Sequence, residues 1–303
     1  MKLGILVSDL GTESLKDNIK KAHEIGYDCV EISACKDDNR PNIVSCSKSE
    51  ARGIVEFTKD LGLEISGFQC HFHQGYASLD EKLWRDSIEH TKRVIELADA
   101  LNVPVVHTVS GILADLDSTQ YAEYTGKIDY FSRKEWGRLL EAYNELLDFA
   151  AKTKVKIGIE PVFVYIIGNY RTTKKFFEDL GRNDLYINFD PGHFPYHRES
   201  PIPIIEKFGK RIIHSHVKDG QILRLNEEDI KNKEAWAMEG NQEEFKFAPP
   251  GKGVLNWKEI VTNLEEVGYK GVLSLEMGHG YIGTPENIAT ENLAFFKKIL
   301  EEE

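Results

Sequence analysis

Four side chains that can bind a divalent cation stand at the ends of short apolar runs in the second half of the chain. They are Glu160, Asp190, His216 and Glu276. The first three are separated by 30 and 26 residues, and the last two by 60, which equals one further repeat plus a long insertion. Three carboxylates and one imidazole suit Mn²⁺ and also tolerate Co²⁺, Mg²⁺ or Zn²⁺. The sequence therefore predicts a divalent-metal site, provided that the four runs end at the same place.

These runs belong to a larger set of short strand-like segments that are rich in β-branched residues. The eight segments are Lys2–Ser8, Cys29–Ser33, Glu64–Cys70, Val103–Val109, Lys156–Val162, Leu185–Asp190, Arg211–Val217 and Gly271–Glu276. Stretches of helical period lie between or after them, namely Ser14–Ile25, Ser49–Leu61, Asp80–Leu101, Lys134–Lys152, Thr172–Leu180, Trp257–Val267 and Thr284–Leu300. Repeated strand–helix units are typical of a parallel sheet. Eight of them predict a single α/β domain, a (β/α)8 TIM barrel, whose active site is built where the strands end.

The rival architecture is a doubly wound open sheet, which normally carries a glycine-rich phosphate loop after an early strand. The sequence has no such motif. Capping residues agree with the predicted helices, because Ser14 and Ser49 can accept hydrogen bonds from first-turn amides. Glycines also follow four helices where a left-handed residue is favoured, at Gly26, Gly62, Gly181 and Gly268.

One connection is far longer than the few residues usual between a strand and its helix. Residues 219–253, between the seventh strand and its helix, carry eight acidic and five basic side chains. They also include Trp236, Met238, Phe245 and Phe247, too many large apolar side chains for a wholly solvated linker. We interpret the insertion as a lid over the barrel mouth or as a surface that contacts a partner. It is long enough to reach a neighbouring subunit of a homo-oligomer.

Composition restricts the function further. The 303 residues carry 38 Lys and Arg against 50 Asp and Glu, a formal net charge of −12, and 41% are hydrophobic. We expect residues 1–303 to form one globular domain, and the charge disfavours broad electrostatic binding to nucleic acid.

The longest apolar run, Pro161–Ile167, is far shorter than the roughly 20 residues that cross a membrane. With four cysteines in no disulfide or zinc pattern, we expect a cytoplasmic protein without a membrane partner.

Several motifs together resemble a known family. They are Glu160-Pro161, Asp190-Pro191-Gly192-His193, His214-Ser215-His216-Val217-Lys218-Asp219, Gly251-Lys252-Gly253 before Trp257, and Leu275-Glu276. Their order and spacing resemble the xylose isomerase-like TIM-barrel superfamily of sugar or sugar-phosphate isomerases and epimerases. In its ketose 3-epimerase and keto-inositol branches the matching residues bind one divalent metal, which implies that role for Glu160, Asp190, His216 and Glu276. The resemblance also implies that Glu160 and Glu276 are catalytic and that His193 contacts substrate oxygens.

The implied chemistry is proton transfer beside the carbonyl of a keto sugar or a cyclic keto polyol. A divalent metal that chelates the carbonyl and the adjacent hydroxyl acts as a Lewis acid and stabilises the enediolate that forms when the α-proton leaves. If Glu160 and Glu276 lie on opposite faces of that carbon, one removes the proton and the other returns it with inversion, which is epimerisation.

Two other outcomes of the same enediolate stay open. Return of the proton to the neighbouring carbon gives isomerisation, and loss of a β-hydroxyl gives dehydration, as in the similar inosose dehydratases. Ile166 stands where ketohexose 3-epimerases tend to carry a further substrate-binding glutamate. This departure weakens a simple ketohexose assignment.

Other polar residues near the predicted barrel mouth are expected to bind substrate. They are His71, His107, Lys218 and Arg224. His73 is a further candidate near the mouth. His214 shares a strand face with His216 by alternation, so it either orients a ligand or fills the barrel interior.

Two functions from other classes also stay open. The AP endonuclease (endonuclease IV) family shares this barrel and uses histidines of strands three and four for additional zinc ions, so His71 and His107 resemble part of its ligand set. Its Asp-x-His pair beyond strand seven has no counterpart here, because residues 219–253 contain no histidine. A noncatalytic or regulatory subunit is the third hypothesis, and the four retained ligands argue against it.

Overall fold

The structure, a computed structural model, describes residues 1–12, 14–35, 40–71, 75–113, 130–224, 243–278 and 281–302. Within these residues, eight parallel strands close into a barrel in the order β1-β2-β3-β4-β5-β6-β7-β10. They are β1 (Lys2–Leu6), β2 (Cys29–Ser33), β3 (Glu64–Gln69), β4 (Val105–Val109), β5 (Lys156–Glu160), β6 (Leu185–Phe189), β7 (Ile212–Val217) and β10 (Val272–Leu275). Each strand lies inside the segment predicted for it, which confirms the (β/α)8 barrel.

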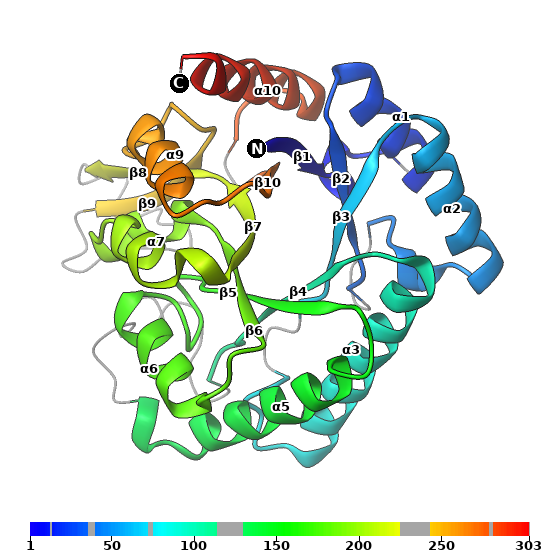
Figure 1. The fold of residues 1–303 in the computed structure, drawn as a ribbon. Helices are drawn as coiled ribbons and strands as arrows, with labels where there is room; N and C mark the ends of the chain where they lie inside the picture. Colours follow the sequence, from blue (N-terminus) through cyan, green and yellow to red (C-terminus); the bar gives the residue numbers. More distant parts are fainter. Residues whose placement is uncertain are drawn as a thin grey trace.

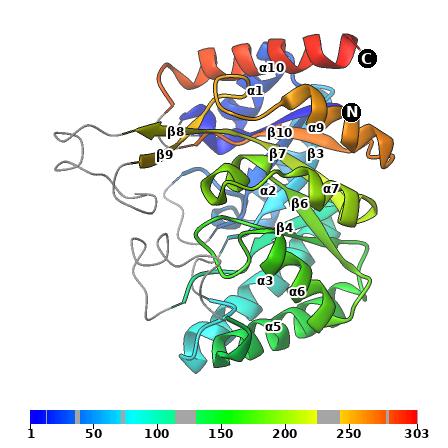
Figure 2. The same ribbon diagram turned by 90° about the vertical axis from the view of Figure 1, so that its left-hand side faces the viewer.

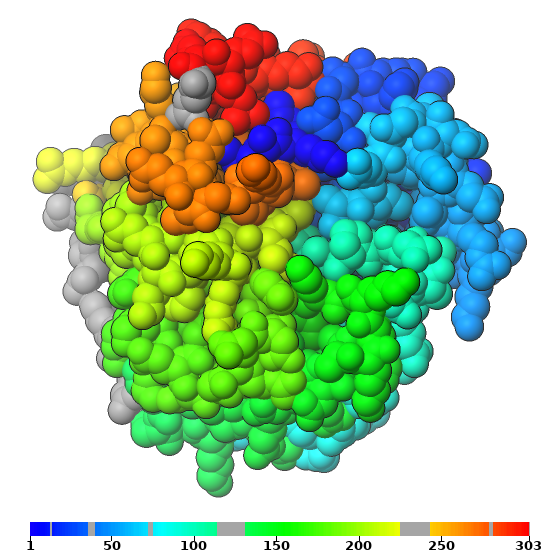
Figure 3. Space-filling model, viewed as in Figure 1, coloured from blue at the N-terminus to red at the C-terminus, as the bar shows by residue number. Residues whose placement is uncertain are grey.

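Helices form an outer layer around the strands (Figure 1). They are α1 (Leu15–Ile25), α2 (Lys48–Asp60), α3 (Glu81–Leu101), α5 (Lys134–Ala150), α6 (Tyr170–Leu180), α7 (Ile202–Phe208), α9 (Trp257–Glu266) and α10 (Pro285–Glu301). Their apolar residues recur every three or four positions, as Trp136, Leu139 and Tyr143 do in α5, and these faces are buried against the barrel. Side chains fill the spaces between the helices (Figure 3). Among the described helices, none combines the length and apolar character needed to cross a membrane.

Two local features differ from the prediction. Helix α2 is capped by Ser47 and not by Ser49, since Ser47 Oγ accepts from the Glu50 amide while the Glu50 side chain accepts from the Ser47 amide. Only Ser47 has a glutamate three residues later, which this reciprocal capping box requires. The sequence prediction also missed helix α7, because a helix of seven residues after Pro201 is too short to show a clear period.

The other predicted caps are present. Ser14 Oγ accepts from the Asp17 amide at the start of α1. Gly26 and Gly181 end α1 and α6 in the left-handed conformation, and the φ angles of Gly62 and Gly268 are also positive. The four glycines are thus left-handed as the sequence predicted, at the C-cap of α1 and α6 and one residue beyond it in α2 and α9.

The described part of the predicted insertion begins and ends in an antiparallel pair, β8 (Asp219–Arg224) and β9 (Glu243–Ala248). This hairpin extends from the side of the barrel on which the strands end (Figure 2). Phe245 and Phe247 of β9 pack against Phe163 and Tyr196. The hairpin thus lies beside the barrel mouth, while Trp236 and Met238 lie outside the described residues.

The motif Gly251-Lys252-Gly253, which follows the hairpin and precedes Trp257, holds the loop in place. The Asp219 carboxylate accepts hydrogen bonds from the amides of Gly251 and Leu255 and from Trp257 Nε1, each at 3.1 Å. A Cβ atom at Gly253 would lie 2.1 Å from Asp219 Oδ1, so the loop needs glycine there. Asp219 therefore fastens the end of the insertion to the start of α9.

Candidate metal centre

The four predicted ligands lie together at the carboxyl ends of four neighbouring strands. Glu160 is the last residue of β5, Asp190 directly follows β6, His216 is the fifth residue of β7, and Glu276 directly follows β10. One donor atom from each of the four side chains lies within 4.8 Å of the other three. Barrel closure thus brings together residues that are up to 116 positions apart in the sequence.

The donor set fits a divalent cation. Glu160, Asp190 and His216 are buried, and Glu276 is partly exposed. His216 Nδ1 lies 3.3 Å from Glu160 Oε2 and 3.2 Å from Glu276 Oε2, so it faces the same point as the carboxylates. Three carboxylates at this separation, two of them buried, need compensating positive charge. Hard oxygen donors with one imidazole are the ligands that Mn²⁺ and related ions accept.

Lys218 supplies part of that positive charge. Its Nζ lies 2.9 Å from Asp190 Oδ2 and also contacts Glu276 Oε2. Burial by itself lowers the pKa of Lys218, but Asp190, Glu276 and Glu160 hold this pKa well above its usual range. The ring of Phe247 lies over the ammonium group, with its centroid 5.1 Å away. The residue therefore stays charged inside the site.

The carboxylates of Glu160 and Glu276 stay ionised. Burial by itself raises the pKa of each, but His216 holds the pKa of Glu160 well below its usual range. Lys218 and His216 do the same for the pKa of Glu276. Burial lowers the pKa of His216, yet Glu31 and the two glutamates hold it well above its usual range. The site is thus a compact set of paired charges that a cation can enter by displacing a proton.

One oxygen of each catalytic candidate accepts a hydrogen bond from a side chain outside the four ligands. His193 Nε2 donates to Glu160 Oε1 at 3.1 Å, and Gln69 Nε2 donates to Glu276 Oε1 at 2.8 Å. In both residues the other oxygen, Oε2, faces His216. Each glutamate is therefore held at one oxygen from outside the four ligands, while its other oxygen faces the point where the ligands converge.

Local geometry explains the Asp190-Pro191-Gly192-His193 motif. Asp190 Oδ1 accepts from the Gly192 amide at 2.8 Å and so caps a short 3₁₀ helix, η4 (Pro191–His197), which carries His193. A Cβ atom at Gly192 would lie 2.7 Å from the Lys218 carbonyl oxygen, so only glycine fits against the end of β7. The turn thus places His193 beside Glu160.

The predicted substrate-binding residues occupy different positions. His193 and Lys218 lie among the four ligands, and His71 follows β3 with its Nε2 3.6 Å from Glu160 Oε2. Arg224 is exposed at the outer end of β8, where it is paired in register with Glu243. The further candidate His73 lies outside the described residues.

His107 lies inside the barrel. Its side chain is fully buried, and its ring lies tilted against that of His214, with the two ring centroids 4.3 Å apart. His214 is buried as well and fills the barrel interior, which is one of the two roles predicted for it. A Cβ atom at Gly67 would lie 2.4 Å from His107 Nε2, and one at Gly158 3.4 Å from Nδ1, so two glycines make room for the imidazole. Burial holds the pKa of His107 well below its usual range, which leaves the ring neutral.

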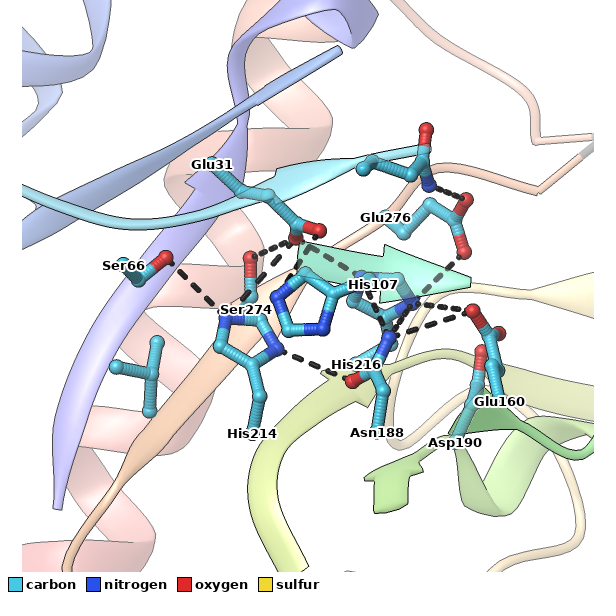
Figure 4. A network of polar contacts seen from close by, with 12 residues as sticks. Glu31, Ser66, His107, Glu160, Asn188, Asp190, His214, His216, Ser274 and Glu276 are labelled. Carbon is cyan, nitrogen blue, oxygen red and sulfur yellow. Dashed lines mark hydrogen bonds and ion pairs between the residues drawn. The ribbon is translucent and has the colours of Figure 1, made fainter. Parts of the chain in front are cut away.

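The sequence analysis missed Glu31, which is completely buried on β2. Its Oε2 lies 2.9 Å from His216 Nε2 and its Oε1 lies 3.6 Å from His107 Nε2 (Figure 4). One signal was available, because an acidic residue in the middle of the apolar segment Cys29–Ser33 needs a buried partner. Alternation along one strand does not reveal which distant strand supplies that partner.

Comparison with known proteins agrees with this architecture. The family model described as "Xylose isomerase-like TIM barrel" matches residues 19–299. Among curated relatives, inosose dehydratases of Glaesserella parasuis and Yersinia enterocolitica are 31% identical over 149 residues and 33% identical over 153 residues. Each match covers 48% of this chain and 49% of the relative, so the chain spans about half the length of the curated relatives it matches.

Solved structures share the fold across nearly the whole chain. The 3-keto-D-glucoside 4-epimerase of E. coli has a TM-score of 0.73 at 14% identity, with 98% of this chain and 99% of that chain covered. The D-allulose 3-epimerase of Methylomonas sp. has a TM-score of 0.72 at 15% identity, with 98% and 96% covered.

Proposed function

The chain belongs to the xylose isomerase-like TIM-barrel family, and from this we propose that it is a divalent-metal-dependent isomerase or epimerase of keto sugars or keto polyols. The observation that carries the proposal is the convergence of Glu160, Asp190, His216 and Glu276, with one donor atom of each within 4.8 Å of the others. Mn²⁺ is the ion that we propose first, and Co²⁺, Mg²⁺ and Zn²⁺ are alternatives.

When bound, the ion supplies Lewis acidity toward a carbonyl and its neighbouring hydroxyl. Glu160 and Glu276 then move the proton of the carbon beside the carbonyl. Both are ionised and can accept it, and both have one oxygen fixed, by His193 and by Gln69 respectively. Strands β6 and β7 lie between β5 and β10, so the two carboxylates approach the centre from separate sides. This supports removal of the proton by one glutamate and protonation of the opposite face of the carbon by the other, after that carboxylate has taken a proton from solvent.

Other side chains would hold the substrate. His193 Nδ1 is buried and has no hydrogen-bond partner among the described residues, so it can bind a substrate oxygen. The Lys218 ammonium can hold an oxygen that carries developing negative charge. His71, whose Nε2 lies 3.6 Å from Glu160 Oε2, is proposed as a further substrate-binding residue. His107 and Arg224 are proposed for the same role.

A second candidate is dehydration of a keto-inositol, which is a lyase reaction. The curated relatives named inosose dehydratase favour it. The same two carboxylates would serve, because loss of a β-hydroxyl follows the same first proton transfer. Here the glutamate that has taken the proton from carbon would, as a carboxylic acid, give it to the leaving β-hydroxyl, which departs as water.

Solvent exchange tests the proposal. The chain, loaded with Mn²⁺ in deuterated water, is incubated with ketoses, ketose phosphates and keto-inositols, and NMR follows the label. We expect deuterium beside the carbonyl of a substrate, no exchange with EDTA, and a loss of several orders of magnitude in Glu160→Gln or Glu276→Gln. Inversion indicates an epimerase, label on the neighbouring carbon an isomerase, and loss of water a dehydratase.

Two results would contradict the proposal. One is the absence of exchange with every compound by protein that demonstrably holds the metal. The other is exchange that continues unchanged in both glutamine variants. Cleavage of abasic-site DNA by the loaded protein would instead support the endonuclease alternative.

A further inference from the structure

The two ring nitrogens of His216 face different surroundings (Figure 4). Nδ1 lies between Glu160 and Glu276, 3.3 and 3.2 Å from their Oε2 atoms. Nε2 lies on the opposite side, 2.9 Å from Glu31 Oε2, which is ordinary hydrogen-bond length. One nitrogen is therefore directed to the proposed ion and the other to a carboxylate outside the ligand set.

Hydrogen bonds and burial fix the side chain of Glu31 on the Nε2 side of His216, away from Glu160 and Glu276. It is fully buried on β2, and Ser274 Oγ on β10 donates to its Oε2 at 3.3 Å. The same oxygen lies 4.0 Å from His214 Nε2. A buried carboxylate in these surroundings needs donors, and His216 is its nearest one among the described residues.

The neighbouring histidine is fully engaged elsewhere. His214 Nδ1 lies 3.1 Å from Asn188 Oδ1, and His214 Nε2 lies 3.2 Å from Ser66 Oγ. Asn188 Nδ2 in turn donates to Glu160 Oε2 at 3.3 Å. His216 is thus the close partner of Glu31, while His214 contacts Asn188, which in turn contacts Glu160.

The side chains of Glu31, His216, His214 and Asn188 form a network of polar contacts. Strand pairing is irregular at two places in this network. The register between β2 and β3 shifts between Val30 and Glu31, and the register between β6 and β7 shifts between Ile187 and Asn188. A bulge re-aims side chains locally and is common beside active sites. The two shifts fall at Glu31 and Asn188, both members of the network.

We infer that Glu31 is a positioning residue of the metal centre, which accepts the Nε2–H of His216 and so leaves Nδ1 deprotonated for the ion. The inference rests on the proposed function. Only a deprotonated nitrogen binds a metal, and a carboxylate on the opposite nitrogen fixes the tautomer, orients the ring and raises the basicity of the ligand. Loss of such a partner typically weakens metal affinity 10–100-fold.

Metal affinity without substrate tests the inference. Protein stripped with EDTA is titrated with Mn²⁺ against a fluorescent chelator, and the bound metal is counted per chain. We expect one ion in the wild type and about 10–100-fold weaker binding in Glu31→Gln. Glu31→Asp keeps the charge but shortens the side chain, so we expect weaker binding there too. Glu64→Gln is the matched control, because Glu64 is exposed at the start of β3 and should leave the affinity unchanged.

The Nε2 proton of His216 gives a readout that a general loss of packing would not move. Coordination of Zn²⁺ through Nδ1 leaves this proton on Nε2 in either variant, so the test measures its hydrogen bond. In ¹⁵N-labelled protein loaded with Zn²⁺, we expect the Nε2–H signal of His216 to lie downfield and exchange slowly with solvent in the wild type, and to move upfield and exchange faster in Glu31→Gln. If Glu31→Gln does not fold, Glu31→Asp is used for both measurements.

Three outcomes would overturn the inference. Unchanged affinity in a folded Glu31 variant, beside one bound ion in the wild type, overturns this inference alone. Two ions per chain would make Glu31 a ligand, since Glu31, His214 and His216 also place one donor atom each within 4.8 Å of one another. A wild-type chain that binds no ion overturns the proposed function as well.

Discussion

Lys218 shows at the scale of single residues how the charges of the site depend on one another. Its ammonium group is buried between Asp190 and Glu276, in a site that also contains Glu160. Without a bound cation, Lys218 and His216 are the nearest described positive charges to these carboxylates. Removing one partner of a buried ion pair costs far more than removing an exposed one, because the other charge stays desolvated.

We therefore predict that Lys218→Met lowers the free energy of unfolding of the metal-free protein by about 3 kcal/mol. Saturating Mn²⁺ should reduce this loss, because the ion supplies the missing positive charge. Lys246→Met is the matched control, since Lys246 is exposed on β9, and it should change stability by less than about 0.5 kcal/mol. Urea unfolding with EDTA and with Mn²⁺ measures both variants, and equal losses in the two would refute the prediction.

For the secondary-structure elements, local hydrogen bonds from side chains to backbone or ring N–H groups hold the segments that carry the site. Asp190 caps the helix that presents His193, and Asp219 fastens the insertion to α9. The capping box of α2 is a device of the same kind at the surface, and the chain offers an internal control for it. Ser47 forms both capping hydrogen bonds, whereas Ser49 is an exposed residue of the first turn.

Ser47→Ala should therefore lower the free energy of unfolding by about 1 kcal/mol, because it leaves the Glu50 amide without its acceptor. Ser49→Ala should change it by less than about 0.5 kcal/mol, since alanine is a better helix former than serine. Denaturant unfolding of the two variants under one condition makes the comparison. A larger loss in Ser49→Ala would show that the helix begins where the sequence alone had suggested.

For the molecule as a whole, histidines whose pKa values are lowered in the folded state link stability to pH. His197 Nε2 lies 3.2 Å from the Phe163 carbonyl oxygen and so joins η4 to the loop after β5. Burial lowers the pKa of His197 to about 4, whereas an unfolded chain has a histidine pKa of about 6.5. Between these values the unfolded state binds a proton that the folded state excludes. Stability is therefore full above about pH 6.5 and falls as the pH drops toward 4.

His197→Gln should make the loss of stability between pH 7 and pH 5 smaller by about 1–2 kcal/mol, because glutamine keeps a donor but does not titrate. Some dependence will remain, since burial also holds the pKa values of His107 and His214 well below their usual range. His23→Gln, on an exposed face of α1, should leave the slope unchanged. Urea unfolding at the two pH values tests this, and an unaltered slope in His197→Gln would contradict the assignment.

The strands, most helices and the four candidate ligands could be predicted from the sequence alone. Each of these features depends on a short stretch of sequence: an apolar run, a helical period of apolar residues, a capping residue, or a polar residue at the end of a strand. The repeat of strand and helix then placed Glu160, Asp190, His216 and Glu276 at equivalent positions, which was enough to expect them to converge.

The surroundings of these ligands, by contrast, depend on how the whole chain folds. Closure of the barrel sets Glu31 against His216, 185 residues away, and the register shifts beside Glu31 and Asn188 aim both side chains inward. Alternation along a strand predicts which residues share a face, but not which distant strand faces them across the interior. The same limit applies to Gln69 of β3, whose hydrogen bond to Glu276 joins two strands that are not neighbours in the barrel. These contacts exist because eight strands close on one axis, which is a property of the whole chain and not of any segment.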